Sequence, residues 1–475
     1  MNTGALSEAE LYRAERRVLE IQTKLHRWSG EDRTRRFDDL FNLVADPAFL
    51  AVAWTRVRGN TGSRSAGVDG VTAMRVRSRD DGETGFLHEI RESLRDRSFR
   101  PEPVRERLIP KPGTDKKRRL GIPTIRDRVV QASLKLVLEP IFEAQFSPSS
   151  YGFRPNRRAH DALAEIVCLT TGTRHYHWVL DADITACFDE IDHSALMSLV
   201  RRRIGDRRVL ALIKAFLKAG ILDEFGDRRL PGTGAPQGAI LSPLLANIAL
   251  TVLDEHLDAN SRLTAVQRAT RKRHGLANYR VVRYADDFVV LVDGHQEHVE
   301  ELRAEIIDVL HGIGLELSEE KSSIVHIDEG FDFLGHRIQR RRKRGTEQRH
   351  VYTIPARKAV ASARARIKEL TSIIKHPDLR VLLLRVNSFL RGWSSYFRYG
   401  VSSQVFKSLR YYTWRRVARW LRRERQATWK TIRHRYMIGW EFQASGITLY
   451  WPKVAGVRYR YRGRNIPTPW TPKRA

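Results

Sequence analysis

Cysteine is scarce in this chain, which holds only Cys168 and Cys187 among its 475 residues. Two cysteines cannot form a disulfide framework, and they are too few for a zinc site built from cysteine pairs. We therefore interpret both as small buried side chains of a protein that folds in a reducing compartment. The small, disulfide-stapled class of secreted proteins is excluded.

Long apolar runs are also absent. No segment approaches the ~18–20 consecutive apolar residues that a membrane-spanning helix needs. Residues 1–15 are polar and helix-forming, unlike a signal peptide. The chain is nevertheless 41% hydrophobic, which is typical of a folded globular protein. Its length suffices for about two to four domains with a sizeable core.

Acidic residues are nearly missing from the last part of the chain. Residues 336–475 contain 35 Lys and Arg but only 5 Asp and Glu, whereas the preceding 335 residues contain 50 of each sign. The whole net charge of +30 therefore lies in this last part. A long basic surface predicts a polyanionic partner.

The same region holds seven of the ten tryptophans. Cationic side chains bind phosphate, while aromatic rings stack on bases or build a core. Structured RNA fits this combination better than an acidic membrane surface does. We therefore expect a cytoplasmic protein that is associated with nucleic acid and has no membrane partner.

Two adjacent carboxylates lie in the middle of an apolar segment. The sequence Tyr284-Ala285-Asp286-Asp287 sits inside the run VVRYADDFVVLV, residues 281–292. Neighbouring strand side chains point to opposite faces, so the pair requires a turn. We predict a strand, a tight turn at Ala285-Asp286-Asp287 and a second strand. Because a buried carboxylate must be paired or metal-bound, we expect a divalent cation there; an ordinary Asp-rich hairpin turn is the alternative.

A third carboxylate, Asp183, ends a predicted strand over residues 176–184. A strand-end Asp can reach the turn at Asp286 and Asp287 across a sheet. Three converging carboxylates predict a two-metal site with ions ~3.5–4 Å apart. Mg²⁺ suits such a site, because it binds few carboxylates together with water and substrate phosphates. Alternatively, Asp183 caps the helix that follows it.

Hydrophobic periodicity predicts a mixture of helices and strands. Ser7 and Glu10 form a capping box at the start of the first helix. Helices are predicted at residues 7–30, 86–99, 126–145, 193–203, 206–219, 241–257 and 296–313, and over most of 356–446. Strands are predicted at 176–184, on both sides of the carboxylate turn, and at 323–328 and 331–338. A hairpin-like turn is predicted at 111–115, and a helix-and-loop insertion is predicted at 259–278. The pattern favours an α+β core followed by a helical, basic region.

Eight sequence segments, taken in order, carry a resemblance to a known family. They are LIPKPGTDKKRRLGIPTIRDRVVQ (108–131), SSYGFRPNRRAHDAL (149–163), LDADITACFDEIDH (180–193), GAPQGAILSPLLANIAL (234–250), RYADDFV (283–289), GLELSEEKSSI (314–324), FDFLGH (331–336) and SFLRGWSSYFRYG (388–400). Together they make the chain resemble a group II intron reverse transcriptase/maturase over most of residues 37–440.

The resemblance implies a right-hand polymerase with fingers, palm and thumb, joined to a basic, helical maturase region. It divides the chain into an N-terminal extension (1–75), fingers and palm (76–335), thumb and maturase-specific region (336–440) and a basic C-terminal tail (441–475). Relatives often carry a His-Asn-His endonuclease with cysteine pairs, but residues after 440 contain no cysteine. We therefore expect the endonuclease-lacking type, in which insertion uses a pre-existing 3′ end.

The resemblance also implies the catalytic groups. The metal ligands are Asp183, Asp286, Asp287 and the carbonyl of Ile184. They bind two Mg²⁺ ions, for which Mn²⁺ can substitute. Lys321 is implied as the general acid that protonates pyrophosphate; a plain ion pair with its neighbour Glu320 is the alternative.

The nucleotide site follows from the same resemblance. The implied deoxynucleotide-binding residues are Lys111, Arg118, Ile184, Phe188, Gln237 and Gly238. Lys111 and Arg118 hold the triphosphate, as suits charge-assisted phosphate contacts. Arg119 stands where the family commonly has proline, so Arg119 is an alternative to Arg118. Phe188 is implied as the gate beneath the sugar 2′ position, with plain core packing as the alternative.

Primer, template and intron RNA each have implied contacts. The primer and template residues are Arg154, Phe333, Leu334 and Gly335, and Tyr151 and Phe153 lie in the same template region or serve core packing. RNA-binding candidates are Arg415, Arg416, Arg419, Arg422 and Arg423. Their spacing of three to four residues predicts a cationic stripe along one helix. Trp393 is interpreted as a bundle-core residue.

The resulting functional hypothesis is an RNA-directed DNA polymerase that binds its group II intron RNA. It assists splicing and copies the RNA into DNA during intron mobility, so template-primer, target DNA and deoxynucleoside triphosphates are expected partners. One alternative is an RNA-binding splicing factor without polymerase activity, against which the intact carboxylate set argues. Another is a reverse transcriptase adopted for defence or repair.

Overall fold

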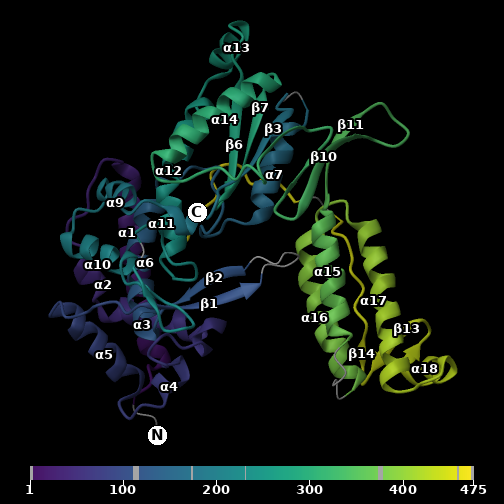
Figure 1. Ribbon diagram of the computed structural model, residues 1–475, viewed down its shortest axis with the longest axis horizontal. Helices are drawn as coiled ribbons and strands as arrows, with labels where there is room; N and C mark the ends of the chain where they lie inside the picture. The colour runs from purple at the N-terminus through teal and green to yellow at the C-terminus, as the bar shows by residue number, and fades with distance from the viewer. Residues whose placement is uncertain are drawn as a thin grey trace. The chain divides into compact units, whose positions relative to one another are not determined.

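The computed structural model describes residues 4–110, 117–172, 175–230, 232–372, 378–456 and 459–471 (Figure 1). The chain divides into two compact units. The first contains Met1–Ala162, Leu180–Ile324 and Arg462–Ala475, and the second contains Leu163–Val179 and Val325–Tyr461. The chain therefore leaves the first unit and returns to it at its C-terminal end.

Helices dominate the N-terminal part of the first unit. The first helix begins at the predicted capping box, where the Ser7 hydroxyl accepts the Glu10 N–H and the Glu10 carboxylate reaches back. The buried side chain of Gln22 donates to the Leu136 carbonyl (2.7 Å) and so ties this helix to α6. The helices are α1 (Glu8–Glu31), α2 (Phe41–Val44), α3 (Pro47–Gly59), η1 (Thr61–Arg64), α4 (Ala73–Arg77), α5 (Gly82–Arg95) and α6 (Ile125–Glu143).

A small sheet of order β2-β1-β4-β5 follows the first helices. Its strands are β1 (Val104–Pro110), β2 (Lys117–Ile122), β4 (Ile221–Leu222) and β5 (Arg228–Arg229). β1 and β2 pair antiparallel from Arg105↔Ile122 to Pro110↔Lys117. The hairpin-like turn predicted at residues 111–115 lies outside the described residues.

The central sheet has the order β6-β7-β3-β8 and carries the predicted carboxylates. Its strands are β3 (Trp178–Asp183), β6 (Asn278–Tyr284), β7 (Asp287–Asp293) and β8 (Ser323–His326). The predicted strand at 176–184 and the predicted hairpin are confirmed. Residues 289–292 are fully buried, as expected for a strand at the centre of a core.

Further helices belong to this part of the chain, and they correct one prediction. The helix predicted over 241–257 is two helices that separate at Leu250, whose ψ of 0° lies outside the regular helical range. The basic insertion predicted at 259–278 does contain a helix. The helices are α7 (Ala159–Thr170), α8 (Cys187–Glu190), α9 (His193–Arg201), α10 (Arg207–Leu217), α11 (Ser242–Ala249), α12 (Thr251–Ser261), α13 (Ala265–Arg273) and α14 (Gln296–His311).

In its longer stretch, Val325–Tyr461, the described residues of the second unit form a three-stranded sheet and four helices. The sheet has the order β11-β10-β9, and the helices share a core that includes Leu382, Leu409 and Leu421. The strands are β9 (Phe331–Phe333), β10 (His336–Arg342) and β11 (Arg349–Pro355). The helices are α15 (Arg357–Leu370), α16 (Leu379–Phe397), α17 (Ser403–Glu424) and α18 (Trp429–Tyr436).

Two predictions for the second unit are wrong in detail. β11 was not predicted, and the charged run at 340–344 hides the end of its partner strand β10. The helical pattern expected as far as 446 ends earlier, in a small sheet. Its strands are β12 (Met437–Ile438), β13 (Glu441–Ala444) and β14 (Ile447–Thr448). Gly439 and Gly446 have positive φ angles of 60° and 76°, which turn the chain between these strands and end the helix.

The C-terminal segment of residues 462–471 packs within the first unit. Arg462 binds both oxygens of the buried Asp161 (2.8 and 2.6 Å). Trp470 is only 5% exposed, and its indole N–H donates to Gln22 on α1 (3.1 Å). Part of the region expected to be a basic tail is therefore built into this unit.

Candidate active site

The carboxylate turn is a two-residue connection between β6 and β7. Tyr284 pairs with Asp287, so Ala285 and Asp286 form the loop. Ala285 has φ +60°, a left-handed conformation that costs a residue with a Cβ about 1–2 kcal/mol. This conformation needs support from the surrounding structure.

Arg283 provides this support from beneath the turn. Its side chain is completely buried, and its guanidinium donates to the Ala285 carbonyl (2.9 Å) and to Asn247 Oδ1 (3.1 Å). Asp254 on α12 accepts from the same guanidinium at two positions, with Nε–Oδ1 at 2.8 Å. A buried charge needs such a partner, so Arg283 and Asp254 fix the backbone that presents the carboxylates.

Gly152 packs directly against this turn. A Cβ placed on Gly152 would lie 2.3 Å from the Ala285 nitrogen and 2.8 Å from the Tyr284 carbonyl carbon. The Gly152 carbonyl accepts from the side-chain amide of Asn247 (2.9 Å). Only glycine permits this approach, so the segment at Gly152 closes the turn from a second side.

Asp183 meets the turn at the end of the adjacent strand β3. β3, which ends at Asp183, is the neighbour of β7, which begins at Asp287, in the central sheet. Burial above all, and then the negative charges of Asp286 and Asp183, raises the pKa of Asp287 to about 7. Burial likewise raises the pKa of Asp286, with a smaller contribution from Asp183. Asp183 therefore lies close enough to the turn for its charge to disfavour the ionisation of Asp286 and Asp287.

Two cations face these carboxyl groups. The Lys321 ammonium makes an ion pair with Asp183 Oδ2, and Lys321 and Arg118 both lower the pKa of Asp286. The Lys321 side chain is 64% exposed, so it can move while it remains beside the site. The geometry places Lys321 at the carboxylates rather than only at its neighbour Glu320.

The donor set has the chemistry that a divalent cation requires. Within the described ranges, no three His, Cys, Asp or Glu side chains form a ready-made metal site. The pKa of Asp287 is nevertheless raised to about 7, first by burial and then by the negative charges of Asp286 and Asp183. Carboxylate oxygens are the ligands that Mg²⁺ prefers. Asp183, Asp286 and Asp287 therefore fit a magnesium site in composition and in charge.

The predicted nucleotide-site residues on the loop before α11 lie near a fourth carboxylate. The Gln237 side-chain amide donates to Asp189 Oδ2 (3.1 Å). Gly238 has φ +104°, and a Cβ there would lie 2.9 Å from the Gly121 carbonyl oxygen. The loop is thus held closely against β2, which fixes where Gln237 points.

Phe188 is half-buried on α8 and is not enclosed in the core. Its ring meets that of Phe153 edge-on, with centroids 6.1 Å apart. Phe153 itself is 49% exposed. A half-buried aromatic with one open side can both pack and limit space for a ligand, so the predicted gate stays compatible with this geometry.

The two neighbouring arginines of β2 have different surroundings. Arg119 is paired with Glu106 (3.9 Å), which Arg229 also binds (3.0 Å). Arg118 instead lowers the pKa of Asp286. Since adjacent strand residues point to opposite faces, this arrangement favours Arg118 for the nucleotide role. Lys111 lies outside the described residues.

Arg154 is buried and bound by other groups of the protein. Its guanidinium binds both oxygens of the buried Glu143 (2.9 and 2.8 Å) and the Ser150 carbonyl (2.7 Å). Tyr151 is completely buried, in agreement with core packing. Arg154 is therefore occupied in this conformation, and its template contact stays a prediction.

Several residues that shape the site were not singled out from the sequence. They are Arg283, Asp254, Asn247, Gly152, Asp189 and Gln131. Gln131, buried on α6, accepts the Ile240 N–H (2.9 Å) and fixes the loop of Gln237. For Arg283, Asp254, Asn247 and Gln131, the available signal was a polar side chain at an otherwise apolar position of a helix or strand.

Two family matches cover the regions just described. Residues 109–338 match the reverse transcriptase (RNA-dependent DNA polymerase) family. Residues 360–437 match the group II intron maturase-specific domain.

Whole-chain relatives agree with these matches. The chain is 37% identical over 364 residues to protein YkfC of Escherichia coli (strain K12), covering 72% of this chain and 93% of YkfC. It is 30% identical over 473 residues to the group II intron-encoded protein LtrA of Lactococcus lactis subsp. cremoris, covering 84% of this chain and 76% of LtrA. The chain belongs to the group II intron-encoded reverse transcriptase/maturase family. An uncharacterized 91 kDa protein in the cob intron of Schizosaccharomyces pombe is 29% identical, covering 78% of this chain and 53% of that protein.

Membership confirms the central functional prediction. This reverse transcriptase/maturase is an RNA-directed DNA polymerase that also serves splicing. Intron RNA and nucleic-acid substrates follow from the same two domains, and reverse transcriptases act with divalent metal ions. Among the described residues, no helix could span a bilayer.

The predicted primer-contacting turn of this reverse transcriptase/maturase lies in the second unit. Phe333 pairs with His336, and Leu334 and Gly335 form the turn with φ angles of +48° and +74°. The Tyr396 hydroxyl on α16 donates to the Leu334 carbonyl (2.9 Å). A helix of the maturase-matching region thus holds this turn.

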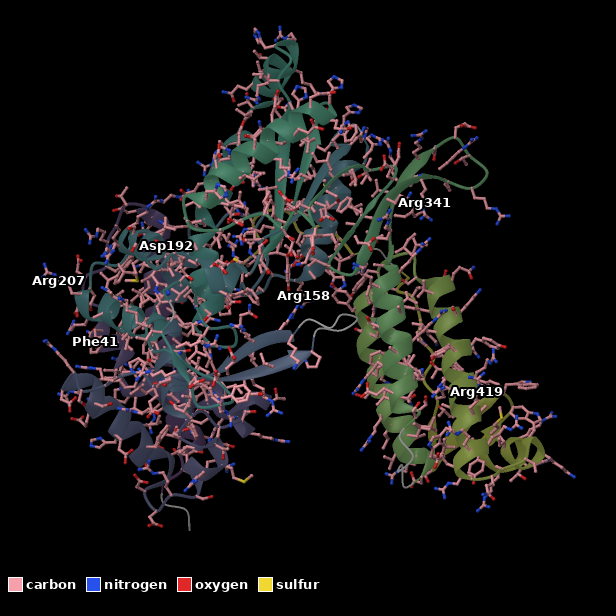
Figure 2. The ribbon with its side chains drawn as sticks, viewed as in Figure 1. Phe41, Arg158, Asp192, Arg207, Arg341 and Arg419 are labelled. Atoms are coloured by element: carbon pink, nitrogen blue, oxygen red, sulfur yellow. The ribbon has the colours of Figure 1, made fainter. Side chains whose placement is uncertain are left out.

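The predicted arginine stripe of the maturase region lies on α17. Arg415, Arg419, Arg422 and Arg423 are exposed, and Figure 2 labels Arg419 on this helix. Arg416 differs, because its guanidinium donates to Thr371 and Ser372 (2.8 Å each) and joins α17 to the end of α15. Four of the five predicted RNA-contact residues are therefore open to a ligand, and one is structural.

Proposed function

We propose that this reverse transcriptase/maturase extends a primer by two-metal nucleotidyl transfer at Asp183, Asp286 and Asp287. The observation that supports the proposal is that β3, which ends at Asp183, lies next to β7, which begins at Asp287. When bound, a pair of Mg²⁺ ions, or Mn²⁺ in its place, activates the primer 3′-hydroxyl and stabilises the leaving pyrophosphate. The Ile184 carbonyl, next to Asp183, is the proposed additional ligand.

The remaining residues bind the nucleotide and handle a proton. Lys321 stands beside Asp183 and is the proposed donor of a proton to the leaving pyrophosphate. Arg118, together with Lys111, holds the triphosphate. Phe188 limits space at the sugar 2′ position, and the Gln237-Gly238 loop lies under the nucleotide.

The wider architecture follows as a proposal. Fingers and palm occupy residues 76–335, the thumb and maturase-specific region 336–440, and the Phe333-Leu334-Gly335 turn grips the primer. The exposed arginines of α17 bind the intron RNA, whose own chemistry performs splicing. The protein then copies this RNA into DNA at a target site.

Primer extension on an RNA template tests the polymerase site. Asp286→Asn removes one carboxylate charge, and we expect extension to fall by at least ~10³-fold, since the metal loses a ligand that positions the reacting groups. Asp293→Asn is the matched control, because Asp293 ends the same strand and pairs with Lys272 instead (2.7 Å). Intron-RNA affinity and splicing assistance are measured on both variants and should remain near the wild-type values.

Two results would contradict the proposal. If Asp286→Asn extended primers normally, the carboxylate cluster would not be the catalytic centre. If wild-type protein failed to extend any primer with Mg²⁺ or Mn²⁺ but still assisted splicing, a splicing factor without polymerase activity would be the better description.

A further inference from the structure

A β-ribbon that the sequence analysis left unassigned projects from the sheet of the second unit (Figure 1). β10 and β11 pair over seven positions, from His336↔Pro355 to Arg342↔Arg349. β9 covers the edge of β10 only as far as Ile338, and the Arg340 N–H still donates to the Ile327 carbonyl (2.9 Å). Beyond this point the strands continue as a two-stranded ribbon, which we call the distal ribbon, residues 341–350.

One face of the ribbon has buried apolar side chains at its base, and the arginines at its end form ion pairs with carboxylates. Ile338 and Val351 are buried. Asp328 binds Arg349 (2.9 Å) on this face, and Glu347 forms an ion pair with Arg342. The cations of this face are therefore already satisfied by carboxylates of the protein.

The opposite face carries cations without such partners. Opposed residues of an antiparallel pair share a face, so Arg341 and His350 lie together, and Lys343 continues on the same side opposite Gln348. In the part of the chain that the structure describes, no carboxylate forms an ion pair with Arg341 or Lys343. The Arg341 guanidinium donates to Gln339 (2.7 Å), and Figure 2 labels Arg341 on this ribbon.

The shape of the ribbon selects among nucleic acids. The major groove of B-form DNA is about 12 Å wide and admits a two-stranded β-ribbon, whereas the A-form major groove of RNA is too narrow for side chains to read. The two strands of the distal ribbon lie about 4.8 Å apart, and they have two paired positions, Arg341↔His350 and Arg342↔Arg349, before the chain turns. A ribbon of this size fits the B-form groove along part of one helical turn.

We propose that the distal ribbon docks in the major groove of duplex DNA through its Arg341 and Lys343 face. Arginine and lysine contact guanine edges and phosphates there, and the Gln348 amide is suited to adenine. This docking proposal rests on the proposed function, because it takes from it that a target DNA duplex is among the partners. It adds a DNA-docking surface outside the polymerase site and outside the arginine stripe of α17.

A face-specific charge comparison tests this docking. The double variant Arg341→Gln with Lys343→Gln removes two charges from the docking face. The matched control, Arg342→Gln with Arg349→Gln, removes two charges from the opposite face of the same ribbon. Fluorescence anisotropy across a salt series measures how tightly each full-length protein binds a fluorescent DNA duplex of about two helical turns. The same measurement is made with an RNA duplex of the same sequence.

The docking-face variant should bind duplex DNA about tenfold more weakly, with a salt slope smaller by about two, because each lost phosphate contact removes ~0.9 from the slope. The control should lose less than about threefold, and RNA-duplex binding should not distinguish the two variants. Methyl green, which occupies the major groove, should displace the wild-type protein more readily than it displaces the docking-face variant.

Three outcomes would overturn the proposal. If both double variants lost the same DNA affinity, the effect would be one of general charge. If the docking-face variant lost as much affinity for the RNA duplex as for the DNA duplex, the ribbon would be an RNA contact. If the docking-face variant bound DNA as tightly as the wild type, the ribbon would have no role in docking. Primer extension on a pre-annealed template separates these failures from failure of the proposed function. All of these proteins should extend primers normally if only the ribbon is affected.

Discussion

The buried residues under the carboxylate turn define the candidate site as much as the carboxylates do. Ala285 is held in a left-handed conformation, and Arg283 donates to its carbonyl while Asp254 neutralises the guanidinium. A planar guanidinium holds a carboxylate in a fixed two-point geometry while it donates to a carbonyl, whereas a flexible ammonium lacks this fixed geometry. We therefore treat Arg283 as a positioning residue that acts through the turn.

Substitution of Arg283 by lysine should loosen the turn without removing the buried charge. We expect kcat for primer extension to fall by about 10- to 100-fold, since small misplacements of reacting groups are costly. KM for the nucleotide should change little. Steady-state extension kinetics measure both constants, and Arg273→Lys on the exposed helix α13 is the control. A lower unfolding temperature with unchanged kcat would show that Arg283 is structural only.

Individual residues differ in how well their role could be predicted from the sequence. The Asp286-Asp287 pair inside an apolar run indicated its turn, because strand alternation forbids two adjacent carboxylates on one face. Arg154 was predicted to contact template, yet Glu143 binds it in the interior. Sequence does not reveal this ion pair, because Arg154 lies in an irregular segment whose path back to Glu143 at the end of α6 is not encoded locally.

At the scale of the element, α17 carries two kinds of arginine one turn apart. Arg419 is exposed, whereas Arg416 is engaged by Thr371 and Ser372. Helical spacing predicted a stripe that contains both residues. Only the packing of α15 against α17 separates the arginine that is available to RNA from the one that holds two helices together.

Paired single substitutions separate these roles. Arg419→Gln should weaken intron-RNA binding about threefold and reduce the salt slope by ~0.7–0.9, because one phosphate contact is lost. Arg416→Gln should instead destabilise the helical region by about 1–2 kcal/mol, because it breaks hydrogen bonds to two hydroxyls. Filter binding across a salt series and thermal unfolding measure the two effects. Identical behaviour of both variants would contradict this division.

The distal ribbon shows an element that the sequence concealed. Five cations within 341–350 interrupt the alternation by which strands are identified. The backbone pairs nonetheless, because Ile338 and Val351 bury the base of one face. A ladder that starts from a buried base can continue through residues whose own preference is weak.

At the scale of the whole molecule, the chain closes back on its beginning. Trp470 packs against His26 of α1, with ring centroids 5.6 Å apart, and Arg464 pairs with Asp258 (3.3 Å). The C-terminal segment thus connects helices from distant parts of the first unit. Its basic residues are partly engaged by the protein's own carboxylates.

Removal of the buried indole should therefore weaken the polymerase body. Trp470→Ala should cost about 3–5 kcal/mol, as expected for a large aromatic deleted from a packed site. The half-life of primer-extension activity on heating should shorten accordingly. Trp440→Ala is the control, because Trp440 is 65% exposed and its loss should stay within about 1 kcal/mol. Equal heat stability of both variants would show that the segment contributes nothing to the fold.

The sequence by itself determined the acidic triad, the turn that presents two of its members, the mixed architecture and the cationic C-terminal region. These features depend on local spacing, alternation and composition, which a linear chain displays directly. The tertiary structure alone decided that Arg283 supports the turn, that Arg154 and Arg416 are engaged internally, and that the C-terminal segment returns to α1. Each of these depends on a partner in another segment of the chain, such as Asp254 for Arg283 and Gln22 for Trp470. The free energy of burying a polar group is settled only when packing brings that partner within hydrogen-bonding distance.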